Sequence, residues 1–353
     1  MKAKILRYSA PFLAALATAV GLSLSGCHPI EEFESDLYGN FDALWTILDE
    51  HYCFFEEKGI DWTATGEQYR ARIKPDMKQT EFFDLCAGML AELRDGHVNL
   101  SSFFNTSYYR NWWSDYPEDF DWRLIQEYYL DWNYSVAGGV SYKLLEDKNV
   151  GYMRYGSFAS PVGDSMLDVM MLSFKDSDGL IIDIRDNGGG DMTNVEKLVS
   201  RFITEKTLAG YIIHKTGPGH NDFSEPYAYY FNTAEGHVRW LKPVVVLMNR
   251  STFSAANNFV SIMQYLPQVL TVGTRTGGGS GIPFSSELPN GWSIRFSASP
   301  VLDPEKKATE SGIDPAEGCT ISMDPEQARL GRDTMLDFAI ELLNKFAEEK
   351  EKS

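Results

Sequence analysis

A predicted strand, tight turn and helix at residues 243–263 constrain the fold of this chain more than any other feature. The apolar, β-branched run Pro243–Met248 indicates a strand that stops at Asn249, and after five further residues a helical pattern begins at Ala255. Ser254 then stands at the mouth of a helix, where a free N–H group and the helix dipole favour a serine that attacks a carbonyl. Serine is also a common N-cap residue, so this stretch alone leaves a purely structural role open.

Strands alternate with helices around this segment. Val150–Tyr155 and Gly179–Arg185 are typical of strands, and Asp164–Phe174 between them is typical of a helix. The alternation predicts an α/β domain, which we place at residues 142–324. A C-terminal helix and a charged tail are expected to follow at residues 325–353.

The N-terminal part of the chain predicts a different organisation. Apolar residues at helical spacing indicate a small helical domain at residues 37–100, and its last turn carries His97 between a helix and a short strand. An aromatic-rich connector follows at residues 101–141. Its rings either pack against the body of the protein or grip a ligand, and packing is the commoner role of such rings.

The chain begins with a predicted export signal. A basic start precedes the apolar segment Ala10–Leu24, which ends in Leu24-Ser25-Gly26-Cys27. This ending resembles the bacterial lipoprotein box, so we expect residues 1–27 to be a lipoprotein signal peptide, Cys27 to carry the lipid, and residues 28–36 to form a tether. The expected location is the bacterial cell envelope, facing the periplasm or the outer surface, with the lipid as the only contact to the membrane.

Charge and composition exclude several classes of function. The formal net charge of −18 argues against a surface that binds nucleic acid. The three cysteines beyond the signal have neither metal-ligand spacing nor an even number for a disulfide framework. The glycine-rich turns at residues 188–190 and 277–281 lack the Lys-Ser/Thr pair of a phosphate-binding loop. We therefore expect neither a metal nor an organic cofactor.

Four motifs in sequence order resemble those of the tail-specific, or C-terminal-processing, serine peptidases. They are Gly179–Gly190, Ser251–Ala256, Gly273–Gly277 and Glu310–Pro315. The resemblance covers roughly residues 37–324 and implies a spiral α/β catalytic core like that of the Clp protease and crotonase families. Many relatives carry a PDZ module after the helical leader, but too few residues separate Leu100 from Asp147 to hold one.

This family has two catalytic schemes, and the sequence favours the less familiar one. The Ser–Lys scheme puts its lysine where this chain has Gly279, and no lysine occurs between Ser254 and Lys306. The other scheme resembles the tricorn protease core, which takes a His from the helical leader, a Ser from the strand-turn-helix and a Glu from the C-terminal motif. His97, Ser254 and Glu310 occupy these places.

The resemblance implies a role for each of these residues. His97 would be the general base for Ser254, and Glu310 would orient and stabilise the imidazolium. The N–H groups of Ala255 and Gly189 would form the oxyanion hole.

The residue before the histidine departs from the tricorn-like pattern. That pattern has a Ser there, whereas Gly96 precedes His97 in this chain, so Glu310 would contact His97 directly or through water, or Asp95 would help. The expected function is a serine-type peptidase that hydrolyses envelope or extracellular polypeptides through an acyl-enzyme on Ser254. The alternative is a catalytically silent ligand carrier on the same fold, as in retinoid-binding modules that resemble this family.

Overall fold

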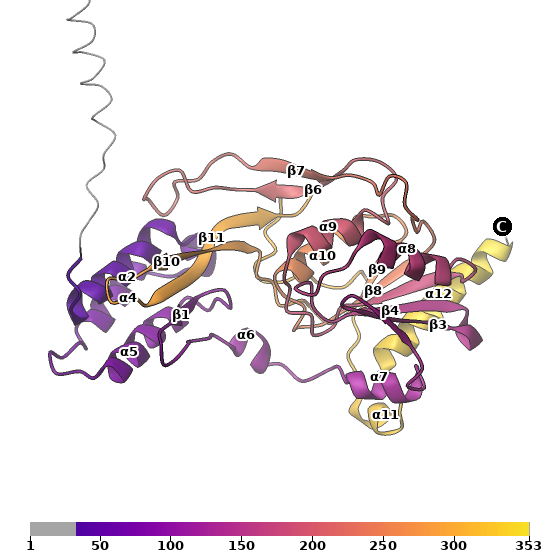
Figure 1. Ribbon diagram of the computed structural model, residues 1–353, viewed down its shortest axis with the longest axis horizontal. Coiled ribbons are helices and arrows are strands. Elements are labelled where there is room, and N and C mark those ends of the chain that lie inside the picture. The colour runs from indigo at the N-terminus through magenta and orange to yellow at the C-terminus, as the bar shows by residue number, and fades with distance from the viewer. Residues whose placement is uncertain (1–32, 353) are drawn as a thin grey trace, which may run out of the picture.

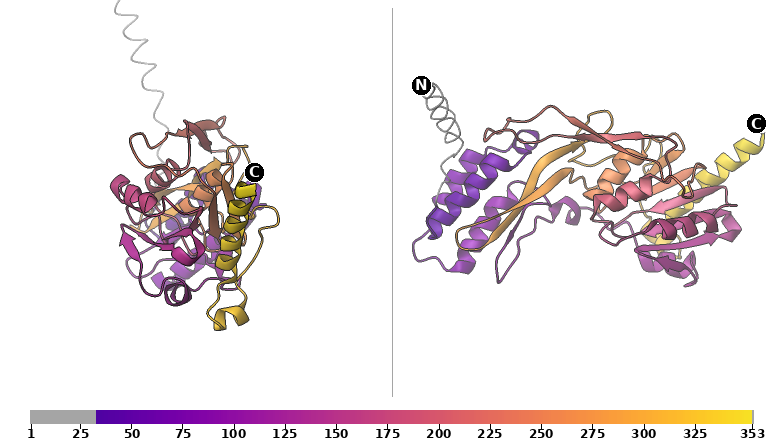
Figure 2. Two further views of the ribbon diagram at one scale, coloured as in Figure 1. Left: turned by 90° about the vertical axis from the view of Figure 1, so that its right-hand side faces the viewer. Right: turned by 45° about the horizontal axis from the view of Figure 1, so that its top comes forward.

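Two β-sheets organise the part of the chain that the structure describes. The structure is a computed structural model, and it describes residues 33–352. The predicted signal peptide, Cys27 and most of the predicted tether lie outside these residues. The N-terminal helices and the C-terminal helix lie at opposite ends of the molecule, with long β-strands between them (Figure 1, Figure 2).

The central layer is a six-stranded sheet with the order β2-β3-β4-β5-β8-β9. The strands β4, β5, β8 and β9 run parallel, whereas β3 pairs antiparallel with β2 on one side and with β4 on the other. The bounds are β2 (Ser135–Ala137), β3 (Val140–Leu145), β4 (Val150–Tyr155), β5 (Gly179–Asp183), β8 (Val244–Met248) and β9 (Val269–Gly273).

Helices cover both faces of this sheet, which is why every residue of β5 and β8 is buried. Alternate side chains of β8 point to opposite faces, so Val246 packs with one set of helices and Val245 with the other. One face carries α8 (Asp164–Ser173), α9 (Met192–Val199) and α10 (Ala255–Met263), and the other carries α7 (Trp122–Tyr128) and α12 (Thr334–Lys352) (Figure 1). The α/β architecture predicted from the alternating pattern is therefore present.

The N-terminal helices pack against strands from late in the sequence. Ile294, Phe296 and Ala298 of β11 share a buried apolar cluster with α2, α4 and α5. This late strand thus belongs to the second sheet and not to the six-stranded one. The helices are α2 (Leu37–His51), α3 (Phe55–Lys58), α4 (Trp62–Arg70) and α5 (Gln79–Ala91), and the strands of the second sheet are β1 (Asn99–Ser101), β6 (Thr207–Ile212), β7 (Tyr227–Phe231), β10 (Gly281–Glu287) and β11 (Ser293–Leu302).

The aromatic-rich connector joins the two ends of the molecule. It contains α6 (Asn111–Ser114), and the indole of Trp112 stacks on the ring of Phe253 with 4.1 Å between ring centroids. Further along, Leu124 and Ile125 of α7 enter the core beneath the six-stranded sheet. The short elements that remain are a 3₁₀ turn at Glu146–Lys148 and α11 (Pro325–Arg329). Among the residues described, no helix combines the length and the apolar character that crossing a membrane requires.

Candidate active site

Ser254 lies on a strained turn between β8 and α10. Its backbone has φ = 57° and ψ = −123°, a conformation that non-glycine residues seldom adopt. The turn is held from both sides, because Thr252 Oγ1 donates to the carbonyl of Ile184 and Ser254 N donates to the carbonyl of Gly278. The side chain of Ser254 makes no cap for α10, which leaves its hydroxyl free for another partner.

That partner is His97. Its Nε2 lies 2.9 Å from Ser254 Oγ, although 157 residues separate the two in sequence. His97 is 3% exposed, and its ring lies against Phe253 with 4.8 Å between ring centroids. Burial lowers the pKa of His97 to about 4; Asp95 opposes this shift, while Arg295 and Lys58 add to it. The imidazole is therefore neutral near pH 7 and able to accept a proton from Ser254.

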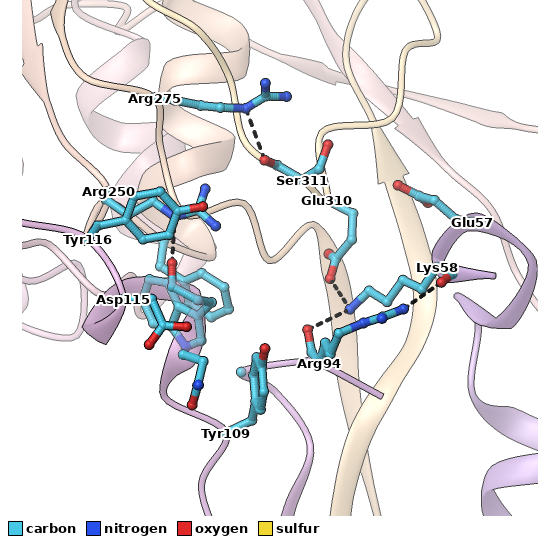
Figure 3. Close-up of a pocket in the computed structure, with 15 residues that line it drawn as sticks. Glu57, Lys58, Arg94, Tyr109, Asp115, Tyr116, Arg250, Arg275, Glu310 and Ser311 are labelled. Carbon is cyan, nitrogen blue, oxygen red and sulfur yellow. Dashed lines mark hydrogen bonds and ion pairs between the residues drawn. The ribbon is translucent and has the colours of Figure 1, made fainter. Parts of the chain in front are cut away.

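Glu310, the predicted third member, is not hydrogen-bonded to His97 in the described part of the chain. Its Oε1 lies 2.8 Å from Lys58 Nζ (Figure 3). Its Oε2 accepts a hydrogen bond from Ser280 N. His97 Nδ1 is buried and has no hydrogen-bond partner among the described residues. The direct contact between Glu310 and His97 that we considered from the sequence is thus not made in this structure.

Asp95 is the carboxylate linked most closely to His97. Its Oδ1 accepts a hydrogen bond of 2.7 Å from His97 N, and its Oδ2 accepts hydrogen bonds from Tyr52 Oη and Ser297 Oγ. Burial alone raises the pKa of Asp95, but Lys58, His97 and these hydrogen bonds together hold that pKa below its ordinary value. Asp95 therefore keeps a negative charge beside the imidazole.

Glu310 differs from Asp95 in its protonation. Burial, followed by the charge of Asp95, raises the pKa of Glu310 to about 7, although Lys58 and Ser280 N act in the opposite direction. Two nearby buried carboxylates resist ionising together, which gives them different pKa values. Asp95 is therefore ionised over the whole neutral range, whereas Glu310 gains its charge only as the pH rises through about 7.

One of the two N–H groups predicted for the oxyanion hole already has an acceptor in this structure. Gly189 N donates to Asn187 Oδ1 at 2.9 Å and is already engaged. Within residues 33–352, the N–H groups of Ala255 and Gly188 donate to no protein acceptor. Gly189 remains important for space, because a Cβ there would lie 2.8 Å from Ala255 N and from Ser254 Cβ.

The position of the family's dyad lysine cannot hold a side chain here. Gly279 has φ = +76°, and a Cβ there would lie 2.4 Å from ring atoms of Phe253. A lysine does lie near the site, but it is Lys58, which the sequence analysis does not assign to it. No local signal marks Lys58, because only folding brings the end of α3 against the Asp95 turn and the Glu310 loop.

Two cavities border Ser254. One of about 550 Å³ is lined by His97, the glycine turn at residues 188–190, and Trp112 and Trp113 of the connector. A second of about 370 Å³ runs past Ala255 and is largely apolar, with Tyr229, Phe231, Ile282 and Val301 in its wall. The connector therefore both packs against the core and lines the cleft. Within residues 33–352, no group of three or more His, Cys, Asp or Glu side chains is placed to hold a metal ion.

Comparisons with known proteins bear on this arrangement. The family model for peptidase family S41 matches residues 149–317, and the model for the tricorn protease C1 domain matches residues 33–91. A carboxyl-terminal-processing protease of Picosynechococcus sp. is 26% identical over 161 residues, which are 44% of this chain and 36% of that protein. A Sulfurisphaera tokodaii protein described as "Putative Tricorn-like protease C-terminal subunit" is 28% identical over 235 residues, 64% of this chain and 24% of that protein. The chain thus spans about a third or less of these curated relatives.

A solved structure matches almost from end to end. It is described as that of "a putative peptidase from Parabacteroides merdae", is 50% identical to this chain, and superposes with a TM-score of 0.83 over 88% of this chain and 97% of its own. The agreement confirms the mixed α/β fold with an N-terminal helical region. Together with the family S41 match over residues 149–317, which include Ser254 and Glu310, this end-to-end similarity to a putative peptidase shows that the chain belongs to peptidase family S41.

Proposed function

We propose that this protein is a serine peptidase that cleaves polypeptides through an acyl-enzyme on Ser254. The observation that carries the proposal is the 2.9 Å contact between Ser254 Oγ and Nε2 of a neutral, buried His97. A serine hydroxyl becomes a competent nucleophile when such a base removes its proton. Family membership supports the same reaction class. We also assign the catalytic core to the spiral class of the Clp protease and crotonase families, which its parallel strands and flanking helices support.

The proposed reaction uses the residues of the site in sequence. His97 takes the proton of Ser254 as Oγ attacks the substrate carbonyl, and the N–H groups of Ala255 and Gly188 receive the oxyanion. His97 then returns the proton to the leaving amine, and a water molecule releases the acyl group by the same steps in reverse. Asp95 provides the negative charge that stabilises the imidazolium between these transfers.

The surroundings of Ser254 suit a polypeptide substrate. Two cavities border Ser254, and together they offer room for a polypeptide at the hydroxyl. The apolar walls of the cavity beyond Ala255 suit an apolar side chain next to the cleaved bond. The aromatic rings of the connector line the other cavity and provide flat contact surfaces for the rest of the substrate.

Labelling with a fluorophosphonate tests the proposed function. The reagent reacts with serines that a base activates, so we expect it to modify Ser254 of the folded protein stoichiometrically. Ser254→Ala should abolish labelling. The control Ser261→Ala removes another buried hydroxyl from the same helix and should leave labelling unchanged. A folded protein with an unreactive Ser254 would instead favour the alternative of a carrier that binds ligands without turnover.

The proposed location is the bacterial cell envelope, with a lipid on Cys27 as the membrane anchor. The Leu24-Ser25-Gly26-Cys27 ending of the export signal supports this proposal. Cys27→Ser should release the protein from the membrane into the soluble envelope fraction, because a single cysteine carries the lipid. Fractionation followed by immunoblotting measures the change, and a variant that stays with the membrane to the same extent contradicts the assigned anchor. Cys53→Ser, at a cysteine within the fold, is the matched control.

A further inference from the structure

A buried ion cluster behind His97 joins three separate segments of the chain. Lys58, the last residue of α3, places its Nζ 2.8 Å from Glu310 Oε1 and 3.5 Å from Asp95 Oδ2. The same ammonium donates to the carbonyl of Arg94 at 3.3 Å. Figure 3 shows the Lys58 side chain reaching between the Arg94 backbone and the Glu310 carboxylate. The side chain of Lys58 is 13% exposed, and that of Asp95 is fully buried.

The ammonium group of Lys58 compensates the negative charge of the two carboxylates in this cluster. Asp95 and Glu310 are two buried carboxylates, and a buried charge is costly unless it is paired. Each has neutral donors of its own, which are Tyr52 and Ser297 for Asp95 and Ser280 N for Glu310. Lys58 is the one cation within the described residues that forms an ion pair with both carboxylates. The Lys58 ammonium therefore favours the ionised form of both carboxylates and holds the two groups at a fixed distance from each other.

We propose that Lys58 is a positioning residue of the active site, whose ammonium group holds the Asp95 and Glu310 carboxylates in place behind His97. This inference rests on the proposed function, because it assigns Lys58 a role in the reaction that His97 and Ser254 perform. Lys58 acts through the two carboxylates, and it has no hydrogen bond or ion pair to Ser254 or His97 among the described contacts.

Lys58 does not replace His97 as the base. Burial lowers the pKa of Lys58, but Asp95 and Glu310 more than offset this effect and raise that pKa above its ordinary value. The side chain is thus a permanent cation at neutral pH. The other titratable and charged groups that face the cluster are Tyr52 and Cys53 after α2, Glu57 on α3, Arg94 and His97 on the turn after α5, and Arg295 on β11.

Lys58→Met tests the inference through the pH dependence of fluorophosphonate labelling. The variant leaves the cluster with two carboxylates and no cation, so His97, Asp95 and Glu310 all bind their protons more tightly. The acid limb of the labelling rate constant is expected to move up by about one pH unit, with a loss of about tenfold near that limb. A purely structural role changes the amount of folded protein and leaves the shape of the pH profile alone.

Restoring the charge balance is expected to restore the profile. The double variant Lys58→Met/Asp95→Asn removes one positive group and the carboxylate that is ionised at acid pH, so the net charge of the cluster returns to that of the wild type. Its acid limb should lie near the wild-type position, whereas that of Lys58→Met/Glu310→Gln should stay with Lys58→Met, because Glu310 is already protonated in that pH range. The control Lys242→Met deletes a lysine that donates to two backbone carbonyls, those of Lys175 and Ser177, and should leave the profile unchanged.

The outcomes separate this inference from the proposed function. Wild-type protein that resists labelling contradicts the proposed function. Wild-type protein that reacts, together with a Lys58→Met variant that reacts at the same rate and with the same pH profile, overturns the role of Lys58 alone. If Lys58→Met does not fold, Lys58→Gln carries the same test, because it keeps most of the side-chain length and a polar donor but removes the charge.

Discussion

Alanine at Ser254 or His97 is expected to remove nearly all polypeptide turnover, and the double variant should be little worse than either single one. The hydroxyl and the imidazole are 2.9 Å apart and act as one unit, so losing either member disables both. We expect kcat to fall by about 10⁴-fold or more in each variant, with the remaining rate due to binding and the oxyanion hole. Release of fluorescent peptides from a heavily labelled protein substrate measures this loss.

Matched variants show whether such a loss comes from chemistry or from unfolding. Ser261→Ala and His220→Ala alter a buried serine of α10 and a histidine that pairs with Asp49, both outside the site, and should keep most of the activity. Thermal unfolding of all variants should stay close to that of the wild type. Additive losses, with the double variant far below both single variants, would contradict a shared catalytic step.

Ser254 and His97, the proposed nucleophile and base, could be identified from the sequence because each lies in a locally recognisable segment. The run from Pro243 to Ala255 contains a buried strand, a turn and a helix start, and these fix the position of Ser254 wherever the domain lies. His97 sits on a turn between a helix and a short strand, which the glycine before it marks. Their meeting in space depends on the packing of two domains. It was predicted from a family resemblance rather than from spacing.

The network behind His97 could not be predicted in the same way. Asp95 is held by Tyr52 and Ser297, of which the second is 202 residues away on β11. The helical domain was expected to form its own unit, but its core includes β11, and this packing brings Lys58 against Glu310. Side-chain contacts between distant segments leave no periodic pattern in the sequence. The choice between Asp95 and Glu310 therefore required the structure.

Glycines show both the strength and the limit of the sequence pattern. The sequence has Gly279 where the Ser–Lys scheme has its lysine, and the nearby Phe253 ring leaves little room for a side chain at that position. The sequence indicates that the turn at residues 188–190 offers N–H groups, but a single side-chain hydrogen bond decides which of them is free. Asn187 Oδ1 occupies Gly189 N and leaves Gly188 N open. The sequence therefore identifies the turn, but the structure is needed to see which of its N–H groups has no acceptor.

Asp95→Asn is expected to cost more activity than Glu310→Gln, although the family resemblance gives Glu310 the role of third member. Asp95 accepts a hydrogen bond from His97 N and is the carboxylate whose charge acts on the imidazole. Asparagine keeps the shape and removes this charge, so the imidazolium loses a buried ionic partner. We expect kcat/KM to fall about a hundredfold at pH 7, as for a lost charged contact of about 3 kcal/mol. Asp119→Asn, at another buried carboxylate with two side-chain donors, is the control.

The activity losses of Asp95→Asn and Glu310→Gln are expected to depend differently on pH, which distinguishes the roles of the two carboxylates. Lys58, His97 and hydrogen bonds outweigh burial and keep the pKa of Asp95 low, so the ratio of wild-type to Asp95→Asn activity should stay nearly constant from mildly acidic to alkaline pH. Burial raises the pKa of Glu310 to about 7. Below this pH the Glu310 carboxyl of the wild type is protonated and uncharged, so the wild type resembles Glu310→Gln. The ratio of wild-type to Glu310→Gln activity should therefore rise only as the pH passes through about 7. If Glu310→Gln is instead the more damaging change at every pH, Glu310 is the partner of the imidazolium during turnover, and its pairing with Lys58 in this structure is a resting arrangement that substrate binding must open.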